Sequence, residues 1–289
     1  MDTVFITTNN KQLLGAKLGE FAIKKHLKRP NAVAVRLINV DELDVFKAFA
    51  GTTFRRRGET RRFDPDDLQS FTLARLMPPE LSGYTGRAAV IDPDVFALAD
   101  VAELFAFDLA GHALAAPKKA NGQWETSVML LDCAKLRHWS ISHTLEQLAQ
   151  GTVAYDEVMR LTNEKNIIPL PWQWDSFDAI APDTKMLHTT RRLTQPWRTG
   201  LPIDFTRAPL PKLFGIIPRE PIERLLGRRP ARYLPHPDPA VERFFFTLLA
   251  EALAAGAVSH SWLEAEVRAG HARPDLFTTL ARYVPGTTP

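Results

Sequence analysis

The chain has 289 residues, 45% of them hydrophobic, with a formal net charge of +3 and a single cysteine, Cys133. This content is enough to bury a full core, and one cysteine excludes a disulfide framework, which favours a reducing compartment. No apolar run approaches the roughly 20 residues that span a bilayer, and no secretory signal is evident, so we expect a cytoplasmic protein.

The first 40 residues predict a βαβ unit. Residues 4–7 form a strand-like run, residues 12–28 repeat apolar side chains at helical spacing, and residues 32–40 form a second strand-like run. Strands that alternate with helices indicate a largely parallel sheet with helices on its faces. We therefore expect an α/β fold.

The next segment is basic. Residues 55–62 carry five arginines and one glutamate, within a polar stretch (51–67) that predicts a long loop, functional or mobile. The arginines are either a solvated surface or a binding surface. A helix is expected at Leu68–Leu76, ended by Pro78 and Pro79.

Two carboxylates follow a buried strand. The apolar run Ala88–Ile91 ends on Asp92 and Asp94, and ligands gather beyond the carboxyl ends of strands in α/β sheets. Two aspartates there suit a hard divalent cation, which in turn suits a diphosphate. A second Asp-Pro-Asp sequence, Asp64-Pro-Asp66, serves for comparison. It lies in a charged segment that predicts a turn and helix cap, so the three residue types alone do not indicate a metal site.

The rest of the chain predicts short helices and strands, and after Trp197 the composition becomes basic and rich in proline. Helices are expected at 99–105, 134–139 and 143–150, and strands at 127–131, 167–170 and 185–188. Three further helices are expected at 239–255, 261–269 and 275–283. We predict a catalytic domain at 1–197, a basic proline-rich linker at 198–238 and a helical C-terminal segment at 239–289.

The linker contains a second basic stretch. Residues 207–232 carry seven basic and two acidic side chains, interleaved with leucine, isoleucine and phenylalanine. This pattern is either a solvated loop or a surface that contacts anionic lipid head groups. Its five prolines argue against one continuous helix.

Several other chemistries have no motif in the sequence. There is no dinucleotide fingerprint, P-loop, G-x-S-x-G elbow or H-x-x-x-H zinc pair. His188 ends a predicted strand, where a lone histidine is usually structural. If that strand lies beside Asp92 and Asp94, however, the three side chains form a site suited to Mn²⁺ or Mg²⁺. Arg191 and Arg192 would then hold a diphosphate.

A family resemblance rests on the order and spacing of six elements. They are Thr7–Asn10, Arg75, Gly86–Asp94, Ser127–Asp132, Leu170–Asp175 and His188–Trp197. In this order the chain resembles nucleotide-sugar transferases of the GT-A fold, in particular glycosyltransferase family 8, over Val4 to Trp197. The resemblance implies a Rossmann-like, mostly parallel mixed sheet flanked by helices, with a helical appendage at the C-terminus.

The resemblance also implies residue roles and a retaining outcome. It assigns metal ligation to Asp92, Asp94 and His188, the nucleoside pocket to Thr7, Thr8 and Asn10, and donor contacts to Arg75 and Ser127. The acidic residue beside the anomeric carbon is less well placed. Asp156 and Asp175 are the candidates, although each is more simply a cap or surface residue.

The chain departs from the family pattern at three places. Pro93 stands between the aspartates where a small residue is common, and Glu125 or Thr126 replaces an asparagine. The segment after His188 lacks the usual glycine and phosphate-binding lysine, so Arg191 or Arg192 must substitute.

The sequence and its resemblance thus predict a metal-dependent, retaining glycosyltransferase that takes a sugar from a nucleoside-diphosphate donor, expected to be UDP-linked, to a glycan or lipid-linked acceptor in polysaccharide biosynthesis. The acceptor would enter near residues 51–67, whose arginines suit an acidic or phosphorylated glycan, and residues 207–232 would contact the inner face of the membrane. One alternative is a GT-A-fold binding protein that has lost turnover. Another is a nucleic-acid binder, which leaves the aspartate pair unexplained, so no nucleic acid is expected.

Overall fold

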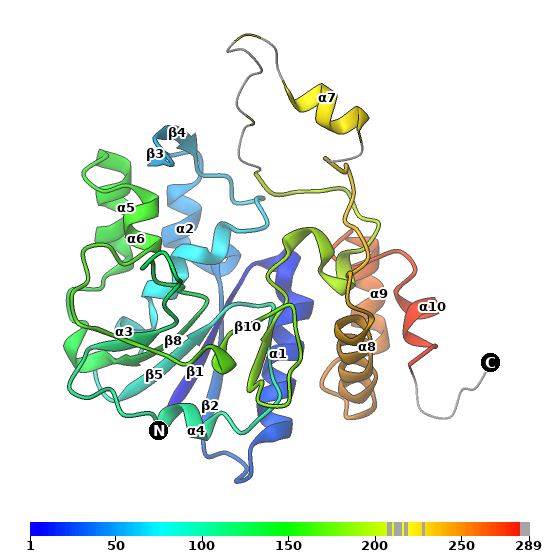
Figure 1. Cartoon of the computed structure of the whole chain (residues 1–289), viewed down its shortest axis with the longest axis horizontal. Coiled ribbons are helices and arrows are strands. Elements are labelled where there is room, and N and C mark those ends of the chain that lie inside the picture. Colours follow the sequence, from blue (N-terminus) through cyan, green and yellow to red (C-terminus); the bar gives the residue numbers. More distant parts are fainter. Residues whose placement is uncertain (207–209, 211–215, 217–218, 227–228, 284–289) are drawn as a thin grey trace.

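A computed structural model shows a central twisted sheet flanked by helices, with a group of C-terminal helices beside it (Figure 1). It describes residues 1–206, 210, 216, 219–226 and 229–283. The six strands lie in the order β2-β1-β5-β8-β7-β9. Their bounds are β2 Ala34–Asn39, β1 Thr3–Thr8, β5 Arg87–Ile91, β8 Val128–Asp132, β7 Leu114–Ala116 and β9 Ile167–Pro169. Of these, β8 runs antiparallel to both neighbours, and the other pairs are parallel. The predicted mixed, mostly parallel α/β sheet is confirmed.

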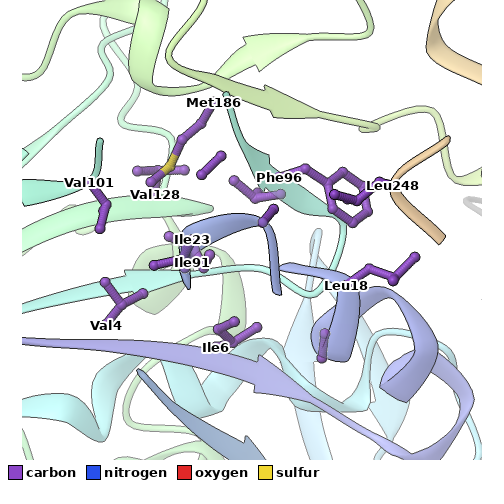
Figure 2. Packing of buried hydrophobic residues seen from close by; sticks show 14 of the residues in the cluster. Val4, Ile6, Leu18, Ile23, Ile91, Phe96, Val101, Val128, Met186 and Leu248 are labelled. Carbon is purple, nitrogen blue, oxygen red and sulfur yellow. The ribbon is translucent and has the colours of Figure 1, made fainter. Parts of the chain in front are cut away.

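The sheet separates two hydrophobic cores because strand side chains alternate between its faces. In β1, Val4 and Ile6 enter one core and Phe5 enters the other. Figure 2 shows part of the first core, to which the strands contribute Ile6 and Ile91 and helix α1 (Leu13–His26) contributes Leu18 and Ile23. The βαβ unit that the sequence predicts, β1-α1-β2, is present.

The arginine-rich stretch forms a β-hairpin, so the expected loop at 51–67 was wrong over most of its length. Strands β3 (Thr53–Arg56) and β4 (Glu59–Arg62) pair antiparallel. Arg57 and Gly58 both have positive φ, the geometry of a tight hairpin turn. Phe54 packs into the second core and anchors the hairpin to the body of the protein.

Two expected helices are shorter than predicted. Residues Ser70–Leu76 form a buried 3₁₀ segment and not an α-helix. The prolines at 78 and 79 begin helix α3 (Pro78–Leu81), because a proline at the first helical position lacks only an amide that has no partner there anyway. The helix expected at 134–139 reduces to a 3₁₀ turn at Cys133–Lys135.

A second, three-stranded sheet lies above the carboxyl end of the main one. Its order is β10 (Ser176–Phe177), β11 (Met186–His188) and β6 (Val95–Ala97). β11 and β6 are antiparallel and bring together segments about 90 residues apart in the chain. The other helices before residue 197 are α2 Asp44–Phe49, α4 Ala102–Phe105, α5 Ile141–Gln150 and α6 Tyr155–Met159.

The three C-terminal helices are present, the third shorter than the expected 275–283 (Figure 1). They are α8 Pro239–Ala254, α9 His260–Arg268 and α10 Leu276–Leu280. Helix α8 packs against α1, and α10 packs against α8. On α8, Phe245 stacks on Trp197 with ring centroids 4.9 Å apart and belongs to the first core. The boundaries of the predicted domains stay a prediction.

Among its described residues the linker contains one short helix, α7 (Arg219–Leu225), which stands away from the sheet in Figure 1. Much of the predicted lipid-contact stretch, including Arg207, Lys212 and Phe214, lies outside the described residues. Within the described residues, no helix has the length and apolar content needed to cross a bilayer.

Candidate metal centre and adjoining cavities

The structure brings the three predicted metal ligands together. Asp92 follows β5 directly, and its amide donates to the carbonyl of Ser127 (3.0 Å). The β11–β6 pairing sets His188 opposite Val95, the residue after Asp94. All three side chains are buried, and one ligand atom from each lies within 4.8 Å of the others. The spatial part of the prediction is confirmed.

The donor atoms of this cluster fit a hard divalent cation. Asp94 Oδ1 is buried and makes no hydrogen bond, a costly arrangement unless another partner completes it. His188 Nδ1 is engaged with Asp175, which leaves Nε2 facing Asp94 Oδ1 at 3.4 Å. Two carboxylates and one imidazole suit Mn²⁺ or Mg²⁺ and leave coordination positions for other oxygens.

Arg75 lies against Asp92. Its Nε donates to Asp92 Oδ1 (2.8 Å), Nη2 bonds Oδ2, and Nη1 donates to Thr126 Oγ1 (2.7 Å). Burial raises the pKa of Asp92 to about 6 even though Arg75 opposes that shift. Burial also disfavours the charge of Arg75, but Asp92 outweighs it, so the pKa of Arg75 lies above its usual value. The guanidinium fixes the orientation of one ligand.

Asp175 lies in the interior, so its interpretation as a surface residue was wrong, although it does cap the 3₁₀ turn Trp172–Trp174. Its side chain is fully buried; it accepts from Ser127 Oγ (2.8 Å) and lies 2.7 Å from His188 Nδ1. Burial opposes protonation of His188, but Asp94 and Asp175 together raise its pKa well above the usual value. A carboxylate in this position sets the ring orientation of a metal-binding histidine. Ser127, predicted to lie near the donor sugar, thus supports the metal centre through Asp175.

Two residues that shape the surroundings of Asp94 had no recognisable signal in the sequence. Gln195 Nε2 donates to Asp94 Oδ2 (3.0 Å) across 101 residues of chain. Gly15 lets α1 approach the aspartate turn, because a β-carbon there would lie 2.5 Å from the carbonyl oxygen of Pro93. Both contacts depend on how α1 and the 195 segment pack, which local pattern does not reveal.

The predicted nucleoside-binding residues lie at the end of β1 but do not line the cavity over the aspartates. Thr7 and Thr8 are buried, and their hydroxyls donate to the carbonyls of Ile91 (3.4 Å) and Asn9 (3.0 Å). Asn10 is exposed and accepts from the side chain of Asn39. Their role in binding a nucleoside stays a prediction.

The aspartates and His188 lie in the wall of a cavity of about 400 Å³, which we call the acid cavity. Asp156, Ser127 and Arg192 also line it. Arg191, the other predicted phosphate ligand, does not; it is exposed and lies 3.8 Å from Asp178. Of the two candidate arginines, Arg192 is the one in reach of the cavity.

Comparison with proteins of known structure finds several glycosyltransferases that match part of this chain. The chain matches the galactosyltransferase LgtC, crystallised with donor and acceptor sugar analogues, at 14% identity and a TM-score of 0.47 over 68% of this chain and 89% of that one. It also matches GlyE of Streptococcus pneumoniae (14% identity, TM-score 0.48, 82% of this chain, 65% of that one). Mouse xyloside xylosyltransferase 1 matches at 11% identity and a TM-score of 0.42 over 66% of this chain and 98% of that one.

The matched structures are glycosyltransferases, the class that the sequence resemblance named. At these identities, and with TM-scores below 0.5, the likeness carries no argument about this chain. No protein-family model matches the sequence, and no curated protein sequence matches it. The chemistry of the site must therefore be argued from its own residues.

Proposed function

We propose that this protein is a metal-dependent, retaining glycosyltransferase that moves a sugar from a nucleoside-diphosphate donor, UDP-linked by preference, to a glycan or lipid-linked acceptor. The observation that carries the proposal is the convergence of Asp92, Asp94 and His188 in the wall of the acid cavity. The buried Oδ1 of Asp94 makes no hydrogen bond and faces His188 Nε2 at 3.4 Å, an arrangement that a cation shared by the two side chains would satisfy.

The residues of the cavity suit charge neutralisation better than covalent catalysis. A cation held by Asp92, Asp94 and His188 would supply compensation for the negative charge that develops on a leaving diphosphate. Arg192, at the rim, adds a bidentate donor for a phosphate oxygen. Arg75 keeps the Asp92 carboxylate in place.

Asp156 is our candidate for the acid beside the anomeric carbon. It lines the acid cavity from α6 and accepts a bond from the amide of Arg57. Asp175, the other candidate, has both oxygens engaged, by Ser127 and by His188. Its place behind His188 suits positioning, whereas Asp156 faces the space that a donor sugar would enter.

The test is a panel of nucleotide sugars with Mn²⁺. A preferred donor should raise the melting temperature by mass action, and the protein should hydrolyse it slowly in the absence of acceptor. Hydrolysis should require Mn²⁺ or Mg²⁺ and stop on chelation. Metal-independent turnover, or hydrolysis unchanged in Asp94→Asn, would exclude the proposal.

A binding protein without turnover is the second candidate. It is favoured by Arg75, whose guanidinium bonds both oxygens of Asp92, and by Ser127, whose hydroxyl is engaged with Asp175. Calorimetry separates the two functions: this candidate binds UDP with Mn²⁺ but hydrolyses no donor over many hours, whereas the transferase does both.

We also propose peripheral contact with the inner face of the membrane. Near α7, Leu225 and Leu226 are 89% and 56% exposed, and Arg219 lies on the same short helix. Exposed leucines beside basic side chains favour anionic lipid surfaces. The protein should sediment with phosphatidylglycerol vesicles more than with phosphatidylcholine vesicles, and Leu225→Ser with Leu226→Ser should reduce this. Leu81→Ser, an exposed leucine on α3, is the control.

A further inference from the structure

A second cavity, of about 380 Å³, adjoins the acid cavity. The two cavities share lining residues, among them Arg56, Arg57, Tyr155 and Arg192. The second is walled by the β3–β4 hairpin on one side and by residues near 192 and 205 on the other. We call it the arginine pocket after six of its lining residues, Arg56, Arg57, Arg61, Arg62, Arg192 and Arg229.

Positive charge predominates in the arginine pocket. Only two carboxylates, Asp64 and Asp67, stand among its described lining residues, against six guanidinium groups. Asp67 is already committed, because it accepts from both the amide (2.7 Å) and the hydroxyl (2.6 Å) of Thr206. Arg61 is paired with Glu59 (2.6 Å), but the lining arginines still outnumber the nearby carboxylates, and a bound anion would neutralise the excess positive charge.

Three of the arginines lie at the junction of the cavities without an ion pair. In the part of the chain that the structure describes, Arg56, Arg57 and Arg192 lie in no salt bridge, although Asp67 is near enough to influence Arg192. Burial lowers the pKa of Arg192, and the neighbouring Arg56 lowers it further. Mutual repulsion of this kind is relieved by an anion between the guanidinium groups.

Aromatic rings hold these arginines in place and give the pocket an apolar side. The guanidinium of Arg56 lies 4.3 Å from the ring centre of Tyr155, and that of Arg192 lies 5.4 Å from the ring centre of Phe205. Stacking of this kind limits side-chain freedom and lowers the entropy cost of binding. Aromatic faces beside oxyanion donors suit a sugar ring that carries an anionic group.

We propose that the arginine pocket binds a phosphate group on the acceptor sugar; this inference rests on the transferase function proposed above. A phosphate monoester carries nearly two negative charges and three acceptor oxygens, so it matches several guanidinium groups better than a carboxylate does. The shared wall of the two cavities would then direct a hydroxyl of the same acceptor toward the donor in the acid cavity.

The test is calorimetry on the full chain with four probes: glucose 6-phosphate, glucose, glucuronate and inorganic phosphate. Each is titrated with and without saturating UDP and Mn²⁺. Glucose 6-phosphate should bind at least about tenfold more tightly than each of the other three, and should still bind when UDP and Mn²⁺ are present. Simultaneous binding is expected because the two ligands occupy adjoining cavities.

A matched pair of variants on the hairpin localises the site. Arg61→Gln with Arg62→Gln should weaken glucose 6-phosphate binding about tenfold, since both residues line the arginine pocket. Arg55→Gln is the control, because Arg55 is exposed on the same hairpin but lines neither cavity. Melting temperatures report whether each variant folds.

Each other outcome overturns a defined part of the inference. Displacement of glucose 6-phosphate by UDP would assign the arginines to the donor site. Equal affinity for inorganic phosphate would indicate a free-ion site, and equal affinity for glucuronate or glucose would remove the preference for phosphate. Sugar-phosphate binding by a protein that binds neither UDP nor Mn²⁺ would instead refute the transferase proposal and leave an anion pocket without an acceptor role.

Discussion

The acid cavity and the arginine pocket are neighbours with opposite character. In the first, Asp92, Asp94 and His188 are buried and supported by a dense set of hydrogen bonds. In the second, the arginines lie on a hairpin and on a segment after β11, and Arg62 is exposed to solvent. One collects negative charge in the interior, and the other collects positive charge at the surface.

The difference concerns how each site obtains its specificity. Asp94 Oδ1, a buried carboxylate oxygen without a hydrogen bond, creates a demand for a cation at one defined point. Half-exposed arginines create a broader field that attracts an anion and orients it with less precision. The proposed transferase would use both, because it would hold a diphosphate against a metal and still admit a separate acceptor.

The largest expected effect comes from removing the arginine that supports the acid cavity. Arg75→Met leaves Asp92 buried without its ion-pair partner, which should lower the free energy of unfolding by about 3–5 kcal/mol. Urea unfolding measures it. The double variant with Asp92→Asn should recover part of the loss, since the unpaired charge is gone. If Arg75→Met alone were as stable as the parent protein, the role of Arg75 as the ion-pair partner of Asp92 would be contradicted.

The next largest effect is expected when a candidate metal ligand loses its negative charge. Asp94→Asn should weaken Mn²⁺ binding by about 100-fold or more, beyond the effect usual for residues that only support a ligand. Calorimetric titration with Mn²⁺ alone gives the affinity. Asp66→Asn is a close control, because Asp66 belongs to the other Asp-Pro-Asp sequence and is exposed. Comparable losses in both variants would mean that the metal binds elsewhere.

A smaller effect on Mn²⁺ affinity is expected from Asp175, which contacts the ring of His188. Asp175→Asn keeps a hydrogen-bond acceptor for His188 but removes the charge that favours metal ligation, so Mn²⁺ affinity should fall about tenfold. Ser127→Ala, which removes only the bond to the other oxygen of Asp175, should have a weaker effect. If the serine variant lost more Mn²⁺ affinity than the aspartate variant, the proposal that Ser127 acts only through Asp175 would be wrong.

The smallest effect tests whether the two regions work together. Arg56 lines both cavities, so Arg56→Gln should weaken UDP binding in the presence of Mn²⁺ and glucose 6-phosphate binding by about two- to fivefold each. Arg55→Gln, on the same strand, is the control. A change in only one affinity would show that the cavities are energetically separate despite their common wall.

Much of the architecture could be predicted from local pattern. The β1-α1-β2 unit and the position of Asp92 after a buried strand follow from the helical spacing of apolar residues in 12–28 and from short apolar runs in the strands. The hairpin at 53–62 was missed because its charged side chains mask the alternation of Phe54 with exposed neighbours. The 3₁₀ segment at 70–76 was read as an α-helix, since both put apolar side chains at similar spacing.

The three candidate metal ligands could be named from the sequence, but the residues that hold them in place could not. His188 joined Asp92 and Asp94 only through a resemblance and a conditional argument about strand position. The place of Asp175 behind the histidine and the bond from Gln195 to Asp94 depend on which strands and turns meet.

By itself, the sequence determined the alternation of strands and helices, the acidic pair at a strand end and the basic segments, because burial and periodicity are local properties of a chain. The tertiary structure decided which of these charges meet. Pairing of β11 with β6 closes the acid cluster, and folding of the hairpin over residues 192–206 assembles the arginine pocket. Contacts between residues 50 to 140 positions apart follow from packing of whole elements, and no short pattern encodes them.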